Sequence, residues 1–241
     1  MKNYFLSLCC LSVFYMFGQN SKVIDSAAIH ILDKMGESIG KIHSCNFQIS
    51  RALDNDGMFG MEKHFYFDDI TMVGPDKMLV KTRSADRNRN YYYNGSKFIY
   101  YSLDENNYCV VDAPNTIIKM IDSLHKKFSI RFPAADVFYP SLTDDLLEEF
   151  PTIVYNGTET IDDVECQEIL ASNNKMNFQL WITNDEKALP KKIVIIHKDG
   201  DRQQYEATFK NWKINTDVED TIFNFYPPEG SKNISIMATS K

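Results

Sequence analysis

The fold of this chain is decided by Gln179–Pro190, "QLWITNDEKALP", which runs directly into "KKIVIIHKDG" at residues 191–200. Side chains alternate between two faces along the first half, as they do in a β-strand. One set is Phe178, Leu180 and Ile182, and the other is Gln179, Trp181 and Thr183. Residues 184–187 then form a polar turn, and Pro190 can begin a returning strand, where a missing N–H is tolerated. The stretch predicts a β-hairpin with a solvated tip, and not a catalytic cluster.

Strands with the same period lie on both sides of this hairpin. Upstream they begin with "NFQISRAL" at residues 46–53 and end with "NYCVVDAP" at residues 107–114. Residues 54–57 (Asp-Asn-Asp-Gly) are expected to form a turn, and Asn94-Gly95 predicts a hairpin with a type I′ turn. About six further strands follow from Thr152 onward. Because strands joined by short turns must be antiparallel, we expect a sheet of about 10–11 antiparallel strands.

Two parts of the chain are helical by pattern. In residues 21–42 the apolar side chains recur every three or four positions, which marks one face of an amphipathic helix. Residues 114–149 begin at Pro114, which fits a first helical turn, and a short helix is predicted from Leu142 to Glu149. Helices grouped apart from the strands indicate an α+β fold. We expect one strongly curved sheet, a half-barrel, with the helices packed over its concave side and residues 114–149 as a lid.

The first residues have the pattern of an export signal. One lysine and an apolar run from Tyr4 to Phe17 precede Gly18, and the run is too short for a transmembrane helix. We expect residues 1–19 to be a signal peptide and residues 20–241 to be a single domain, with the mature protein periplasmic or secreted. A retained N-terminal anchor is the alternative. The formal charge of −7 argues against a nucleic-acid partner.

No pattern of residues predicts catalysis. The five histidines show no HExxH spacing, none pairs with a cysteine at zinc-site spacing, and there is no G-x-S-x-G motif. Cys45, Cys109 and Cys166 are interpreted as buried free thiols, with one disulfide and one free thiol as the alternative. A thiol hydrolase would need a histidine within hydrogen-bond reach of a cysteine. We therefore predict no catalytic residue, no metal and no cofactor.

Aromatic residues are the unusual feature of the composition. They make up 13% of the chain, and many flank the Asn94-Gly95 hairpin, where they must point to both faces. Cross-strand packing can explain them. In the functional interpretation, one set lines an apolar ligand cavity, as in small barrels. The candidate cavity residues are Phe47, Ile49, Phe65, Phe67, Tyr91, Tyr93, Phe98, Tyr100, Ile118, Ile121, Phe138 and Trp181.

The C-terminal half carries a resemblance to a known family. The residues that carry it are Trp181, Leu189-Pro190, Lys192, Phe209, Trp212, Asn215, Phe223, Phe225, Pro227-Pro228 and Gly230. In this order they resemble a family of predicted periplasmic proteins catalogued as domain of unknown function 2092, and the resemblance covers nearly all of residues 21–236. Asp162-Asp163 depart from that family, which often has a glycine there, so the departure concerns this turn alone.

The chain is also similar, more loosely, to the superfamily of lipoprotein carriers that includes LolA and LolB. That similarity implies an incomplete, curved antiparallel barrel with helices as a lid over an apolar cavity. We therefore expect an exported, non-enzymatic, carrier-like monomer that binds a lipid, an acyl chain or a lipoprotein and makes transient contact with a membrane or an envelope protein. The alternative is an envelope module for protein–protein interaction or sensing, without a lipid ligand.

Overall fold

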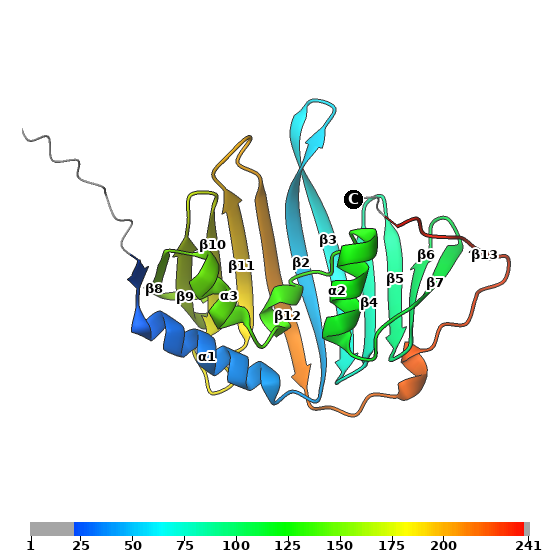
Figure 1. The fold of residues 1–241 in the computed structure, drawn as a ribbon, viewed down its shortest axis with the longest axis horizontal. Coiled ribbons are helices and arrows are strands. Elements are labelled where there is room, and N and C mark those ends of the chain that lie inside the picture. Colours follow the sequence, from blue (N-terminus) through cyan, green and yellow to red (C-terminus); the bar gives the residue numbers. More distant parts are fainter. Residues whose placement is uncertain (1–21, 239–241) are drawn as a thin grey trace, which may run out of the picture.

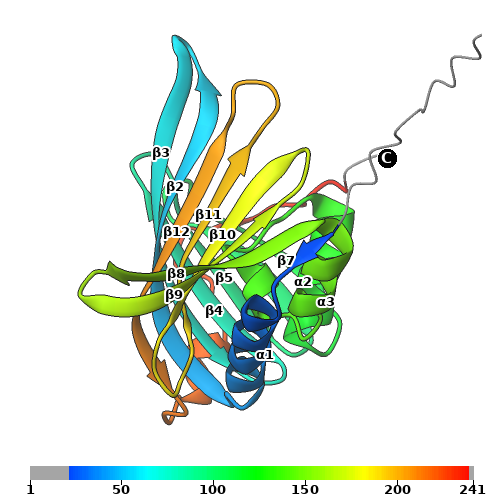
Figure 2. The same ribbon diagram turned by 90° about the vertical axis from the view of Figure 1, so that its left-hand side faces the viewer.

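The computed structural model describes residues 22–238, and these form one open, strongly curved sheet with its helices on one side (Figures 1 and 2). The order of its thirteen strands is β1-β8-β9-β10-β11-β12-β2-β3-β4-β5-β6-β7-β13. Their bounds are β1 Val23–Ile24, β2 Ser44–Gly57, β3 Gly60–Val73, β4 Lys77–Ser84, β5 Asn88–Asn94, β6 Lys97–Ser102, β7 Asn107–Asp112, β8 Thr152–Ile161, β9 Val164–Ser172, β10 Met176–Thr183, β11 Pro190–His197, β12 Gln204–Ile214 and β13 Lys232–Asn233. The half-barrel expected from the sequence is confirmed. The predicted signal peptide, residues 1–19, lies outside the described residues.

The two strands beyond the predicted number are short pieces that cover the edges of the sheet. β1 pairs with β8, and β13 pairs with β7. Both pairs are parallel, so the expectation of a wholly antiparallel sheet is wrong at the two edges. No short turn joins these partners in the chain, so nothing forces them to be antiparallel. The added strands pair with backbone groups that an open edge would otherwise leave exposed.

The helices begin and end where side chains cap them. α1 (Ser26–Gly40) starts after Asp25, whose carboxylate accepts a hydrogen bond from the backbone N–H of Ala27 at 2.8 Å, so it is shorter than the predicted 21–42. α2 (Ile117–Phe128) starts after Thr116, and its C-cap is Ser129, which adopts a left-handed conformation. The short 3₁₀ helix η1 (Ala135–Phe138) and α3 (Leu142–Glu149) follow, and η2 (Asp220–Phe223) lies near the C-terminus. α1, α2 and α3 all lie over the concave side (Figure 2).

The hairpin at the opening stretch is confirmed. β10 pairs with β11 in antiparallel register, and Phe178, Leu180 and Ile182 belong to the main core under the helices. In the exposed turn, the Asp185 carboxylate accepts hydrogen bonds from the backbone N–H groups of Lys187 and Ala188, both at 3.0 Å. The acidic residues of this stretch therefore shape a turn.

The turn predicted at residues 54–57 is wrong. β2 continues to Gly57, and the chain reverses at Met58 and Phe59 before β3 begins. The polar residues extend the ladder because they pair across it, with the Lys63 ammonium 3.1 Å from the Asp54 carboxylate. The β2–β3 hairpin therefore projects beyond the rest of the sheet (Figure 1).

Two hairpin turns differ in which residues adopt a positive φ. The hairpin at Asn94-Gly95 is confirmed, but only Gly95 has a positive φ (90°), while the Asn94 side chain accepts a hydrogen bond from the backbone N–H of Lys97 at 3.1 Å. It is therefore not the type I′ turn that was expected. Asp162 and Asp163, which depart from the family pattern, have φ of 47° and 61° between paired residues Ile161 and Val164. Positive φ at both positions is the hallmark of a type I′ turn.

We expect Asp163→Gly to raise the free energy of unfolding by about 0.5 kcal/mol, because glycine adopts a positive φ without the clash of a Cβ. Asp162 should be kept, since its carboxylate lies 3.2 Å from the Lys191 ammonium. Urea unfolding checks the change. As the opposite control, Asp163→Val should destabilise by about 1 kcal/mol, because a β-branched residue tolerates this conformation poorly. Equal stability of the two variants would contradict the assignment.

Candidate ligand-binding cavity

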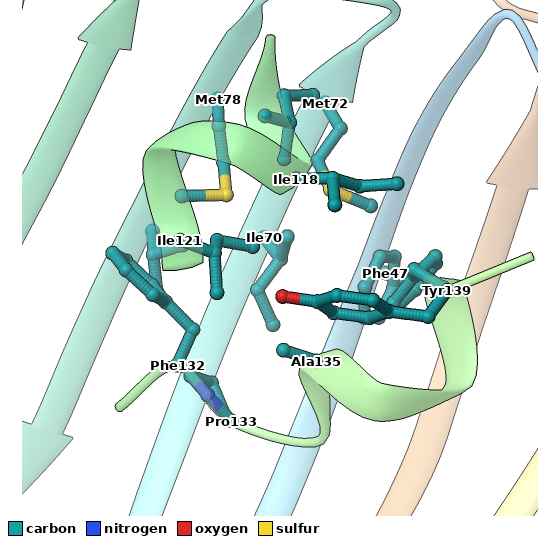
Figure 3. Close-up of a pocket in the computed structure, with 13 residues that line it drawn as sticks. Phe47, Ile70, Met72, Met78, Ile118, Ile121, Phe132, Pro133, Ala135 and Tyr139 are labelled. Atoms are coloured by element: carbon teal, nitrogen blue, oxygen red, sulfur yellow. The ribbon is translucent and has the colours of Figure 1, made fainter. Parts of the chain in front are cut away.

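Three cavities lie in series between the helices and the concave face of the sheet. The middle one, which we call the constriction, has a volume of only about 30 Å³. Its floor comes from β2, β3 and β4, and its roof from α2 and the segment around η1 (Figure 3). The floor residues are Phe47, Ile70, Met72, Met78 and Val80, and the roof residues are Ile117, Ile118, Ile121, Phe132, Pro133, Ala135, Phe138 and Tyr139.

A larger cavity opens on each side of the constriction. The first, the α1-side cavity, has a volume of about 360 Å³ and includes Ile39 in the last turn of α1 and Ile42 just after the helix. The second, the α3-side cavity, has a volume of about 550 Å³ and includes Leu142 and Leu146 of α3. The constriction shares Met72, Ile117, Ile118 and Phe138 with the first, and Ile121, Phe132, Ala135 and Tyr139 with the second. Together they form one interrupted channel whose end cavities have the size of small-molecule sites.

A hydrogen bond closes the roof at the constriction. The Tyr139 hydroxyl donates to the Asp122 carboxylate at 2.7 Å, which joins the segment after η1 to α2. Figure 3 shows the Tyr139 ring lying across the cavity with its hydroxyl toward the centre. Burial, and then the hydrogen bond to Asp122, raise the pKa of Tyr139, so the hydroxyl stays protonated and keeps donating. A space of about 30 Å³ holds roughly one water molecule, so the constriction in this conformation is too narrow for an acyl chain.

The floor is held in place by stacked aromatic rings. The Phe47 ring stacks on that of Trp212 with centroids 4.1 Å apart and on that of Phe138 at 5.5 Å. The Phe209 ring lies 5.9 Å from the Phe47 ring. Since Phe138 belongs to the roof and Trp212 to the sheet, Phe47 fixes the distance between the two layers.

The N-terminal end of the lid is tied to the sheet. The Tyr93 hydroxyl donates a hydrogen bond to the Pro114 carbonyl, and burial raises the pKa of Tyr93 to about 12. The backbone N–H of Ile117 donates to the Pro75 carbonyl at 2.9 Å. These bonds hold the start of α2 against the sheet.

Four of the candidate cavity residues come together in the channel: Phe47, Ile118, Ile121 and Phe138. Five others lie on the same concave face but pack into the core beside the channel: Ile49, Tyr91, Tyr93, Phe98 and Tyr100. Tyr91, for example, contacts Phe98 and Phe132 with ring centroids 6.1 Å and 5.8 Å away. Cross-strand packing therefore accounts for most of the aromatic hairpin.

The remaining three candidates lie on the outer face of the sheet, so their predicted place in the cavity is wrong. On β3, Phe65 and Phe67 point to the face opposite to that of Asp68 and Ile70. Their side chains are 60% and 53% exposed. Trp181 packs in a small separate cluster with Cys166 and Val194. Its ring N–H donates to the Glu159 carboxylate at 3.0 Å. The alternation in the sequence separates the two sets, but it does not say which set faces inward.

Several residues of the channel are not among the candidate cavity residues, most of which are aromatic. Ile70 and Met72 lie two residues apart on β3, as do Met78 and Val80 on β4. The strand period therefore places the two residues of each pair on one face. Tyr139 lies in a proline-flanked segment without a period, and no local signal identifies it.

A buried ion pair lies on the same concave face. The Arg51 guanidinium donates to both oxygens of Asp68, at 2.6 Å and 3.1 Å, and the Thr82 hydroxyl donates to Asp68 at 2.6 Å. Burial acts to lower the pKa of Arg51, but the hydrogen bond and charge of Asp68 outweigh it and raise that pKa. The guanidinium also lies over the Tyr66 ring, 4.9 Å from its centroid. Through these contacts Arg51, Asp68 and Thr82 link β2, β3 and β4.

The cysteines do not form a reactive site. Cys45, Cys109 and Cys166 are free and buried. His43 and Cys45 both line the α1-side cavity, but burial raises the pKa of Cys45 to about 12, so its thiol carries no charge near neutral pH. Burial also raises the pKa of Cys166 to about 11. Within residues 22–238, no group of three or more His, Cys, Asp or Glu side chains is placed to hold a metal ion.

Comparison with solved structures shows the fold. An uncharacterized conserved protein from Thermus thermophilus matches with a TM-score of 0.51 at 8% identity, over 87% of this chain and 99% of that chain. The Mycobacterium tuberculosis lipoprotein LppX matches with a TM-score of 0.51 at 14% identity, over 81% of this chain and 100% of that one. At these identities the likeness concerns the curved sheet and its helices.

Sequence comparison gives the family. A protein of Methanocaldococcus jannaschii is 35% identical to this chain over 107 residues. The matched part is 43% of this chain and 30% of that protein, so the match spans less than a third of the M. jannaschii protein. No helix among the described residues is long and apolar enough to cross a membrane. The family model for predicted periplasmic proteins, DUF2092, matches residues 28–237. The chain therefore belongs to the DUF2092 family of predicted periplasmic proteins.

Proposed function

We propose that this protein is a non-enzymatic carrier that binds an acyl chain of a lipid or lipoprotein in the channel between its helices and its sheet. The observation that carries the proposal is the channel itself, two cavities of about 360 and 550 Å³ joined through an apolar constriction. Burial of each methylene group contributes about 0.8 kcal/mol. A stretch of eight methylenes would therefore gain about 6 kcal/mol before the cost of ordering the chain.

Loading of the whole channel requires the lid to move. The tied start of α2 and the bond between Tyr139 and Asp122 support an opening in which the segment after η1 swings away from α2. The hydrogen bond is exposed to solvent, so water can replace it at a low net cost. The Cys45 thiol in the channel wall is neutral, which argues against thiol catalysis in the channel.

The test is a titration of delipidated protein with N-phenyl-1-naphthylamine, whose fluorescence rises in apolar sites, and displacement of that probe by dodecanol. We expect Ile118→Trp to weaken dodecanol binding at least about tenfold, because the indole would fill the constriction and part of the α1-side cavity. Val110→Trp is the matched control, since Val110 is 45% exposed on β7 and lies away from the channel.

Urea unfolding of both variants shows whether the fold survives the added ring. Absence of dodecanol binding to the wild type would contradict the proposal and favour the alternative of a protein-binding module. Equal binding by the wild type and Ile118→Trp would also contradict it, since the ligand would then lie elsewhere.

A further inference from the structure

The two ends of the channel differ in charge. The rim of the α3-side cavity carries four exposed carboxylates, those of Asp122, Asp136, Asp145 and Glu149, against one guanidinium, that of Arg131. His125 and Tyr139 are the other titratable groups that line this cavity. The polar residues that line the α1-side cavity are His43, Ser44 and Thr116, and none of them carries a carboxylate.

The rim carboxylates form no close ion pair with a lysine or an arginine among the described residues. Asp122 accepts the hydrogen bond from Tyr139, and Asp145 accepts one from the Ser141 hydroxyl at 2.8 Å. Both of these donors are neutral, so the two hydrogen bonds bring no positive charge to the rim.

Beneath this rim the cavity is apolar. Its inner wall is formed by residues that are buried or half-buried, among them Leu146, Phe150, Phe178 and Ile195. A cavity of about 550 Å³ with an apolar inner wall and an acidic rim is complementary to an amphiphile with a hydrocarbon tail and a positive head. A carboxylate head at the same place would be repelled by the rim.

We propose that the α3-side cavity is the entrance for the ligand and selects amphiphiles with a cationic amine head over those with an anionic head. This inference rests on the proposed function, because it concerns the same channel. The tail would lie toward the constriction and the amine at the rim, within reach of Asp136 and Glu149. The class of ligand is therefore a single-chain or lipid amine, and not a free fatty acid.

The experiment compares three ligands with the same chain length, dodecylamine, dodecanol and dodecanoate, each titrated into the full-length mature protein below its micellar concentration. We expect dodecylamine to bind about tenfold more tightly than dodecanoate, a difference that corresponds to about 1.4 kcal/mol, with dodecanol between them. In 1 M salt the Debye length falls to about 3 Å, so the preference should disappear.

The charge at the rim is tested with Asp136→Asn/Glu149→Gln, which leaves the carboxylates bonded to Tyr139 and Ser141 in place. The preference for the amine should fall from about tenfold to about threefold, because half of the rim carboxylates remain. The matched control is Asp199→Asn/Glu186→Gln, which removes the same charge from exposed loops and should leave the preference unchanged.

The outcomes separate this inference from the proposed function. If no ligand of the three binds, the proposed function fails. If all three bind and the amine has no advantage over the carboxylate, the channel is a lipid site but the inference about its entrance is wrong. Equal loss of preference in the rim variant and the loop control would also overturn it, since net charge alone would then explain the effect.

Discussion

Phe47→Ala is expected to lower the free energy of unfolding by about 3–5 kcal/mol, the usual cost of removing a buried phenylalanine ring. Phe47 is 1% exposed and its ring touches those of Trp212, Phe138 and Phe209. Its loss leaves a void between floor and roof that these large rings cannot easily fill. Equilibrium unfolding in urea measures the change.

The neighbouring strand offers a matched control. Phe65→Ala removes the same ring from a side chain that is 60% exposed, so it should change stability by less than about 0.5 kcal/mol. Phe47→Leu keeps most of the volume and should cost roughly 1–2 kcal/mol. If Phe47→Ala were as mild as Phe65→Ala, the layers would not depend on this ring.

Asp68→Asn should lower the free energy of unfolding by about 3–5 kcal/mol. The Asp68 side chain is fully buried and that of Arg51 is 14% exposed. Removing the negative charge leaves the guanidinium in a largely dry site without its counter-ion, and breaking a buried pair is costly for this reason. The hydroxyl of Thr82 also loses a charged acceptor. Thermal or urea unfolding gives the size of the effect.

Asp69→Asn is the matched control, because Asp69 pairs with Arg83 at 2.8 Å on the outer face, where the Arg83 side chain is 63% exposed. Such a pair is worth at most about 1 kcal/mol. The double variant Arg51→Met/Asp68→Leu should recover most of the loss, since apolar residues of similar size can replace a buried pair. A cost for Asp68→Asn no larger than that for Asp69→Asn would show that water reaches Arg51.

Much of the fold was predictable from local patterns. The bounds of α3, the Asn94-Gly95 hairpin and the β10–β11 hairpin follow from the period of apolar residues and from turn chemistry, which depend only on neighbours in the chain. The turn at residues 54–57 was misplaced for a related reason. Its polar residues are good turn formers, but cross-strand pairing with residues 60–63 carried the strands further.

The candidate site was predictable only in part. Phe47, Ile118, Ile121 and Phe138 lie in the channel, but the strand alternation and the helical repeat do not by themselves say which face is the inside. Phe65, Phe67 and Trp181 do not lie in the channel, although each obeys the strand period. Tyr139 was missed because its role depends on a contact with Asp122 of α2, whereas Tyr139 itself follows η1.

The sequence by itself determined which side chains share a face, since alternation along a strand and the helical repeat are properties of the local backbone. Tertiary structure decided which face became the inside. The direction in which the sheet curves, the register of strands far apart in the chain and the packing of residues 114–149 over the concave side arise from long-range burial, which no local pattern encodes. For that reason the same alternation that places Ile70 and Met72 in the channel leaves Phe65 and Phe67 in water.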